Sequence, residues 1–168
     1  MENLIADFFK AWEKEITAYQ EVLICLKDQK EALIEWNINR FQKVSQQTAI
    51  YVNRAHHFTN TRNDLMESIF IMKDIIITEN SLKTISIIFE EEDEVLAERA
   101  EILFQSFVNT LRSIDKLSAE NKDLIQAGLD IVGTNLELIA DLTERDRVYS
   151  RVGMIPQRKN SILLNKRI

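Results

Sequence analysis

The sequence has very few residues that interrupt helices. It contains three glycines, Gly128, Gly133 and Gly153, and one proline, Pro156, so residues 1–127 have neither. Strand-rich folds need turn residues repeatedly, and their scarcity argues against such folds. We expect an all-α protein, either an elongated antiparallel helical bundle or a long coiled-coil hairpin, with short intervening helices.

Cysteine and long apolar runs are also scarce. Cys25 is the single cysteine, which excludes a disulfide within the chain and favours a reducing compartment. The first residues, MENLIADFFKAWEKE, are acidic and amphipathic, unlike a signal peptide. The most apolar patch, IFIMKDIII, contains Lys73 and Asp74 and is far too short to span a membrane. We therefore expect a cytoplasmic protein.

Positive charge is concentrated at one end. The net charge is −6, yet residues 151–168 contain five basic side chains and no acidic one, which leaves −11 for residues 1–150. An acidic body binds nucleic acid poorly. We predict a helical body, 1–150, and a basic, flexible tail, 151–168, which either contacts an acidic surface or is simply solvated.

Apolar residues in the stretch 94–142 follow the heptad spacing of a helix that packs along another helix. One seam position is occupied by Leu96, Leu103, Thr110, Leu117, Leu124, Ile131 and Leu138. The other seam position is occupied by Ala100, Phe107, Ile114, Asn121, Gly128, Asn135 and Leu142. A second apolar row beside this seam comprises Phe104, Leu111, Ile125, Val132 and Ile139. Two rows predict at least two neighbours, and we expect the chain to be organised around this helix.

Glycines inside this helix, Gly128 and Gly133, each cost about 1 kcal/mol relative to alanine. That cost indicates a close crossing by another helix, a local weak point, or a docking site for a partner helix.

The rest of the chain is predicted to form further helices. Residues 3–58 show helical apolar spacing and are expected to form one long helix, in which polar seam residues fix the register or line a groove. The segment 59–64, TNTRND, is the first predicted break. A second break at 78–81 precedes a short helix that ends near Phe89. The acidic run 90–94 suits the N-terminus of the long helix, although a metal or a basic partner is an alternative.

No catalytic constellation is present in the sequence. His56 and His57 are adjacent and point about 100° apart on a helix, and Asn53 and Arg54 stand where a di-iron bundle needs glutamate. Cys25 has no histidine partner and is expected to pack as a small apolar group. The aromatic residues Trp12, Trp36, Tyr19 and Phe8 are expected in the core or the seam. We expect no enzyme activity, no metal and no cofactor.

The order of elements resembles that of the FlgN-like family, bacterial flagellar export chaperones for the hook–filament junction proteins. The run 30–34, KEALI, followed by Asn37, Phe41 and Val44, is similar to the middle of that family's first helix. Residues 81–89 resemble its short connecting segment, and 117–125, LSAENKDLI, its asparagine-marked stretch. Tyr149 with Gly153 resembles the tyrosine–glycine element after its last helix.

This resemblance implies a chaperone that binds the amphipathic terminal helices of hook-associated junction proteins, prevents premature assembly and delivers them to the export gate. An amphipathic client helix would then join the chaperone as an extra member of its bundle. The implied client-binding residues are Phe104, Leu111, Ile125, Leu129, Val132, Leu136 and Ile139. Tyr149 is the implied docking residue for the export gate, and neither nucleic acid nor membrane insertion is implied.

Two other classes of protein stay open. The same stripes suit a structural coiled-coil adaptor or oligomeric subunit that exchanges no client, since a heptad seam serves a monomer or a homodimer equally. A four-helix-bundle metalloenzyme would contain iron or manganese. In the chaperone interpretation, Ile162, Leu163 and Leu164 of the tail are candidates to cover the client groove when it is empty.

Overall fold

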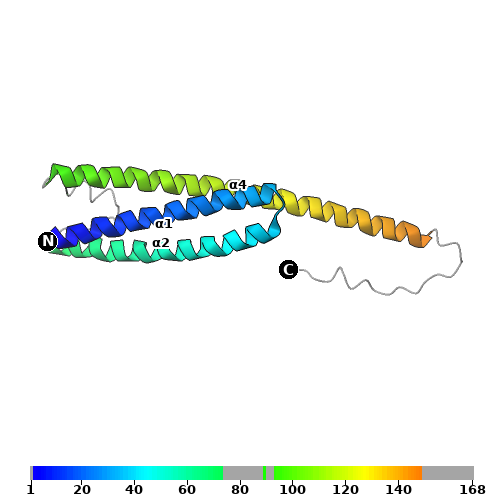
Figure 1. Ribbon diagram of the computed structural model, residues 1–168, viewed down its shortest axis with the longest axis horizontal. Helices are drawn as coiled ribbons and strands as arrows, with labels where there is room; N and C mark the ends of the chain where they lie inside the picture. Colours follow the sequence, from blue (N-terminus) through cyan, green and yellow to red (C-terminus); the bar gives the residue numbers. More distant parts are fainter. Residues whose placement is uncertain (1, 74–88, 90–92, 149–168) are drawn as a thin grey trace. The chain divides into compact units, whose positions relative to one another are not determined.

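The computed structural model describes residues 2–73, 89 and 93–148, with side chains described as far as Leu142. Three helices fill these ranges: α1 (Glu2–Ile34), α2 (Ile38–Met72) and α4 (Glu94–Val148). The described residues contain no strand, which confirms the predicted all-α fold (Figure 1). The chain consists of two compact units, residues 1–127 and residues 128–168.

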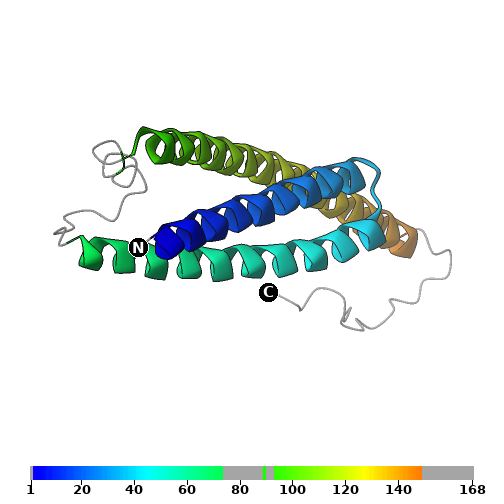
Figure 2. The same ribbon diagram turned by 60° about the vertical axis from the view of Figure 1, so that its left-hand side comes forward.

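In the first unit, α1 is the central helix. Figures 1 and 2 both show it between α2 and the first part of α4. The pairs Glu15–Arg62 and Glu21–Arg54 show that α2 runs antiparallel to α1. The rings of Tyr19 and Phe107 and the ion pair between Glu13 and Arg99 show that α4 runs parallel to α1. The predicted hairpin therefore consists of α1 and α2, and the first unit is organised around α1 instead of around α4.

The turn between α1 and α2 falls at residues 35–37, so the prediction of one helix over 3–58 is wrong. Trp36 has a φ of 54°, and its N–H donates to the Leu33 carbonyl while the Asn37 N–H donates to the Ala32 carbonyl. These two bonds form a Schellman motif, with tryptophan at the left-handed position that glycine usually occupies. The Asn37 side chain then accepts from the Arg40 N–H at 3.0 Å and caps α2. Asn37 is therefore a helix cap.

The predicted break at 59–64 is also wrong, because these residues lie inside α2. The side chains of Thr59, Thr61 and Arg62 have hydrogen-bond partners that do not end the helix. The hydroxyl of Thr61 donates to the His57 carbonyl four residues earlier. The hydroxyl of Thr59 lies within hydrogen-bond distance of two acceptors, the Ala55 carbonyl at 3.0 Å and the buried carboxylate of Glu15 at 2.7 Å. A partner on α1 therefore overrides the capping tendency of these residues.

The start of α4 follows the prediction that acidic residues suit a helix N-terminus. Asp93 precedes the helix, and its carboxylate accepts from the N–H groups of Val95 at 2.9 Å and Leu96 at 3.4 Å. Glu94 lies in the first turn. The predicted break at 78–81 and the short helix before Phe89 lie outside the described residues.

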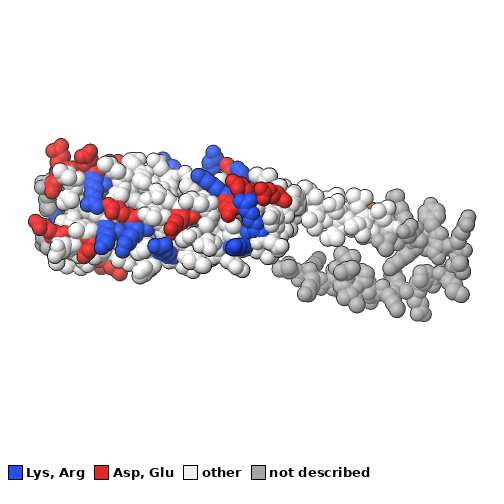
Figure 3. Space-filling view, viewed as in Figure 1, with Lys and Arg blue, Asp and Glu red and all other residues white. Residues whose placement is uncertain are grey.

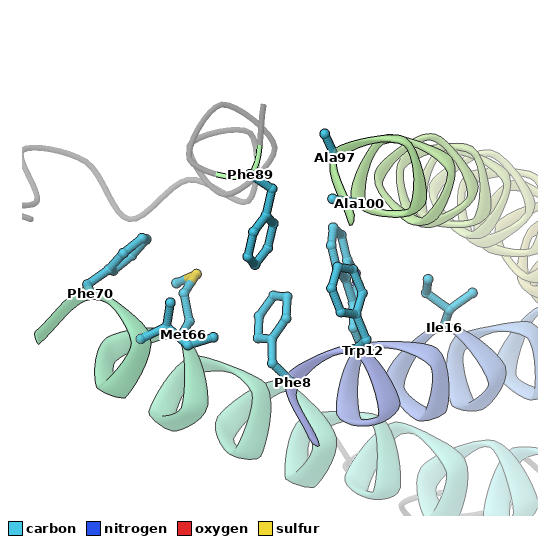
Figure 4. Packing of buried hydrophobic residues seen from close by; sticks show 10 residues of the cluster. Phe8, Trp12, Ile16, Met66, Phe70, Phe89, Ala97 and Ala100 are labelled. Atoms are coloured by element: carbon cyan, nitrogen blue, oxygen red, sulfur yellow. The ribbon is translucent and has the colours of Figure 1, made fainter. Parts of the chain in front are cut away.

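The main core lies near the N-terminal end of α1. Phe8 and Trp12 are fully buried in one cluster. The same cluster contains Phe70 of α2, Phe89, which precedes α4, and Ala100 of α4. Figure 4 shows Phe89 pointing toward Phe8, and Trp12 pointing toward α4. The small side chains of Ala97 and Ala100 let α4 approach these large rings, with the remaining cluster members supplied by Phe9, Ile16, Met66 and Ile69. Phe8 and Trp12 thus confirm the predicted core, whereas Trp36 is 56% exposed, contrary to prediction.

An exposed apolar face on helix α4

The predicted heptad seam of α4 has two parts. From Leu96 to Leu124 every seam position is buried or half-buried, whereas Ile131, Asn135, Leu138 and Leu142 are exposed. Since the spacing is the same throughout, the difference comes from what covers each part. Helix α1 covers the first part of the seam, as the contact between Tyr19 and Phe107 shows.

Asn121 is the last buried residue of this seam. Its side-chain amide donates to the Leu26 carbonyl of α1 at 2.9 Å, so this polar seam residue fixes the register of α4 against α1. Beside it, Lys30 donates to Glu120 at 2.7 Å. That hydrogen bond lowers the pKa of the Glu120 carboxyl from its ordinary value.

Large apolar side chains of the second unit are exposed along one stretch of α4. They are 47–61% exposed, and together we name them the 129–142 face: Leu129, Ile131, Val132, Leu136, Leu138, Ile139 and Leu142. At about 100° per residue they occupy roughly half of the helix circumference. Asp130, Glu137 and Asp141 lie on the other half. Figure 3 shows this stretch almost entirely white, whereas Lys, Arg, Asp and Glu are interspersed over the first unit.

The predicted client-binding residues fall into two groups. Phe104 and Leu111 are half-buried in the first unit, and Phe104 packs against the core cluster. Ile125, the third predicted residue of that unit, is 38% exposed. Leu129, Val132, Leu136 and Ile139 all belong to the 129–142 face. Tyr149 lies outside the described residues.

Sequence reasoning missed three members of this face. Ile131, Leu138 and Leu142 sit at seam positions, which the sequence analysis assigns to packing along another helix and not to client binding. A signal was nevertheless present, because the alternate seam positions change from Ala100 and Phe107 to Gly128 and Asn135. Glycine and asparagine contribute little apolar packing, which marks the place where the internal seam weakens.

Gly133 lies within this stretch, and a methyl group added at its Cβ position would meet no described atom within 4 Å. The described chain therefore provides no close helix crossing at Gly133. At Gly133, a weak point and a docking site for a partner helix therefore remain as interpretations.

The other polar features of the described chain show no reactive centre. Cys25 is buried, as expected for a small apolar group, and burial raises the pKa of its thiol. No three His, Cys, Asp or Glu residues among those described are placed to hold a metal. Two hollows between α1 and α2 share Lys10, Lys14 and Phe58, with charges of both signs in their walls. No helix in the described ranges is long and apolar enough to cross a membrane.

Comparison with known proteins places this arrangement in a family. The profile of one family, described as FlgN protein, matches residues 1–157. No curated protein and no solved structure matches the chain. Because the matched stretch includes all three described helices, the chain belongs to the FlgN family of flagellar export chaperones.

Proposed function

We propose that this protein binds the amphipathic terminal helices of hook-associated junction proteins through the 129–142 face. The observation that carries this proposal is the continuous exposure of seven large apolar side chains on one side of α4. Exposed apolar patches of this kind mark interaction surfaces or become sites of aggregation. An amphipathic client helix would lay its own apolar stripe along the face and remove both surfaces from water.

The free energy gained by covering the 129–142 face is sufficient for reversible binding. Fully burying a leucine, isoleucine or valine side chain contributes about 1.5–3 kcal/mol. The seven side chains are already about half-buried, so covering them contributes on the order of 5–10 kcal/mol before the costs of association. Those costs are of similar size, and the client's own buried residues contribute the surplus. The balance suits a chaperone that holds its client and later releases it.

Binding would keep client helices soluble in the cytoplasm and prevent them from assembling early. Delivery to the export gate is the second part of the proposal, and Tyr149 is the candidate gate contact that the family resemblance supplies. Tyr149→Ala is expected to reduce secretion of the junction protein while leaving the chaperone–client complex intact. Loss of the complex in this variant would instead assign Tyr149 to client binding.

The direct test is co-purification with the C-terminal helical segment of a junction protein, with the mass of the complex measured by light scattering. Leu136→Asp and Val132→Asp should each weaken binding at least about 30-fold, since an interface hot spot contributes 2 kcal/mol or more. Ile50→Asp is the matched control, because Ile50 and Leu136 are both 60% exposed and Ile50 lies on α2. Equal losses in Leu136→Asp and Ile50→Asp would contradict the proposed site.

The same experiment separates the chaperone from a structural coiled-coil subunit. A chaperone forms a discrete complex with the added helix. A structural subunit forms a tight oligomer of its own through the 129–142 face and leaves no site for the client. Self-association that Leu136→Asp abolishes, without any client complex, would favour the structural role.

A further inference from the structure

Helix α1 has a side that its contacts with α2 and α4 leave exposed. Gln29 of α1 hydrogen-bonds to Thr48 of α2, and Lys30 hydrogen-bonds to Glu120 of α4. At about 100° per residue, five exposed residues lie on the opposite side of α1, within an arc of roughly 100°. We name them the open side of α1: Lys10, Lys14, Ile24, Glu31 and Glu35. The last of these follows the end of the helix, and its N–H still donates to the Glu31 carbonyl at 2.9 Å.

The charges of the open side form a self-complementary pattern. Lys10 and Lys14 are spaced four residues apart, as are Glu31 and Glu35. The pair Lys10 and Glu35 has the same midpoint as the pair Lys14 and Glu31, between residues 22 and 23. A second α1 that lies antiparallel about this midpoint places a glutamate opposite each lysine. It also brings the two copies of Ile24 to within about 5 Å of each other along the helix axis.

The two lysines of the open side form no ion pair with any described residue. Glu13, which lines a hollow together with both lysines, pairs with Arg99 at 2.6 Å instead. The amine of Lys14 lies over the ring of Phe58, 5.7 Å from its centroid. Like charges four residues apart destabilise a helix, so carboxylates from another molecule would stabilise this pair of lysines.

The two glutamates belong to a cluster with surplus negative charge. Arg40 pairs with Asp28, Glu31 and Glu35, so three carboxylates share one guanidinium. The side chains of Glu31 and Glu35 are 65% and 56% exposed. Their carboxylates therefore retain acceptor sites for a second cation.

The open side also has an apolar centre and sufficient area for a dimer. Ile24 is 64% exposed and lies close to the midpoint of the charge pattern. The distance along α1 from Lys10 to Glu35 is about 38 Å, and two helices side by side are about 20 Å wide. This side of the α1–α2 hairpin therefore offers on the order of 750 Å² per copy, close to the roughly 800 Å² that each partner contributes to a standard interface.

We propose that two copies of this protein pair through the open sides of their α1 helices. The helices run antiparallel around a twofold axis, the commonest symmetry of soluble dimers, with Lys10 opposite Glu35 and Lys14 opposite Glu31. The 129–142 face takes no part in this contact, so the inference goes beyond the proposed function. One chain cannot form these pairs by itself, because Lys14 and Glu31 lie roughly 26 Å apart along one helix.

The proposal is tested on the full chain without a client. Light scattering over a range of protein concentrations should give twice the mass of one chain at the upper end. A carbodiimide, which joins an amine directly to a carboxylate in contact with it, is then added, and linked peptides are identified by mass spectrometry. We expect links from Lys14 to Glu31 and from Lys10 to Glu35, which the separation along α1 assigns to two chains.

Charge reversal identifies the contacts that hold the dimer. Lys10→Glu with Lys14→Glu places like charges opposite each other, as does Glu31→Lys with Glu35→Lys. Each double variant should raise the Kd of the dimer at least about tenfold, because like charges juxtaposed in an interface are strongly unfavourable. An equal mixture of the two double variants should recover the dimer as a mixed pair, since all four contacts then join opposite charges again.

Matched controls lie on α4. Lys116→Glu with Lys122→Glu changes the net charge by the same amount and should leave the Kd unchanged. Ile24→Glu should raise the Kd at least about tenfold, since it buries a charge at the centre of the interface. Ile102→Glu should not, although Ile102 is 61% exposed and so resembles Ile24 in exposure.

A single-chain mass at every concentration would overturn the proposal. So would a dimer without the two expected links, or charge-reversed variants that stay apart when they are mixed. A dimer that Leu136→Asp abolishes and Ile24→Glu leaves intact would place the contact on the 129–142 face and would also refute the proposal. Because no client is added, failure of client binding does not affect this result.

Discussion

Replacing Glu15 by glutamine should strongly destabilise the protein, because it leaves a charge without its counter-ion in the interior. Glu15 is fully buried and Arg62 is 5% exposed. The Nε of Arg62 donates to one carboxylate oxygen of Glu15 at 2.5 Å, and the Thr59 hydroxyl donates to the other at 2.7 Å. Glu15→Gln keeps the shape of the side chain and removes only the negative charge that neutralises Arg62.

The expected magnitude follows from burial. Breaking a buried ion pair costs about 3–5 kcal/mol. The free energy of unfolding of a typical protein is only about 5–15 kcal/mol. For a chain of this size that loss corresponds to a fall in Tm of roughly 6–20 °C. Replacing both partners by apolar residues, Glu15→Leu with Arg62→Met, should recover most of the loss, because no charge is then buried.

The same two helices provide the control. Glu21 and Arg54 also join α1 to α2, at 3.3 Å, but both side chains are substantially exposed. Glu21→Gln should therefore cost less than about 1 kcal/mol. The free energies of unfolding are measured by urea denaturation followed by circular dichroism. If Glu15→Gln costs no more than Glu21→Gln, the reasoning from burial is wrong.

Three further predictions concern the turn, the exposed helix and the pH dependence. Asn37→Ala should lower the free energy of unfolding by about 1 kcal/mol through loss of the α2 cap, and Asn37→Asp, which can still accept the bond, should not; equal losses in urea denaturation would contradict the capping role. Gly133→Ala should slow hydrogen exchange of the amides in residues 128–142 by about fivefold, since alanine favours the helix by about 1 kcal/mol and meets no described atom; faster exchange would show a clash. Lys30 lowers the pKa of Glu120, so this contact stabilises the fold above the ordinary glutamate pKa, and the contribution is lost as pH falls through the lowered pKa. Urea denaturation across that pH range should give a shallower dependence for Lys30→Met, and an unchanged dependence would refute this assignment.

Much of the fold was predictable because helix periodicity is a local property. The scarcity of glycine and proline predicted the all-α fold, and the register of α4 from Leu96 to Leu124 was correct. The cap at Asp93 could be predicted because an acidic residue just before a helix accepts hydrogen bonds from the N–H groups of the residues that follow it. These features depend on residues that are close in sequence.

The turn between α1 and α2 was misplaced because the deciding contacts are less visible in sequence. Trp36 adopts the conformation that glycine usually provides, so no glycine marked the turn. The residues of TNTRND looked like a break, yet Glu15, 47 positions before Arg62, satisfies two of them inside α2. A buried partner on another helix can reverse what local propensity indicates.

The sequence by itself determined that this chain forms long amphipathic helices, because spacing alone decides which side chains share a helix face. It also pointed to four residues of the 129–142 face through family resemblance. Only the tertiary structure decided which parts of the apolar stripes stay exposed. Ile131 and Leu138 repeat the spacing of Leu117 and Leu124, yet the earlier pair is half-buried and the later pair is exposed. The physical reason is that a side chain is buried only where a second surface covers it. The spacing of apolar residues in one helix carries no information about which of them another helix covers.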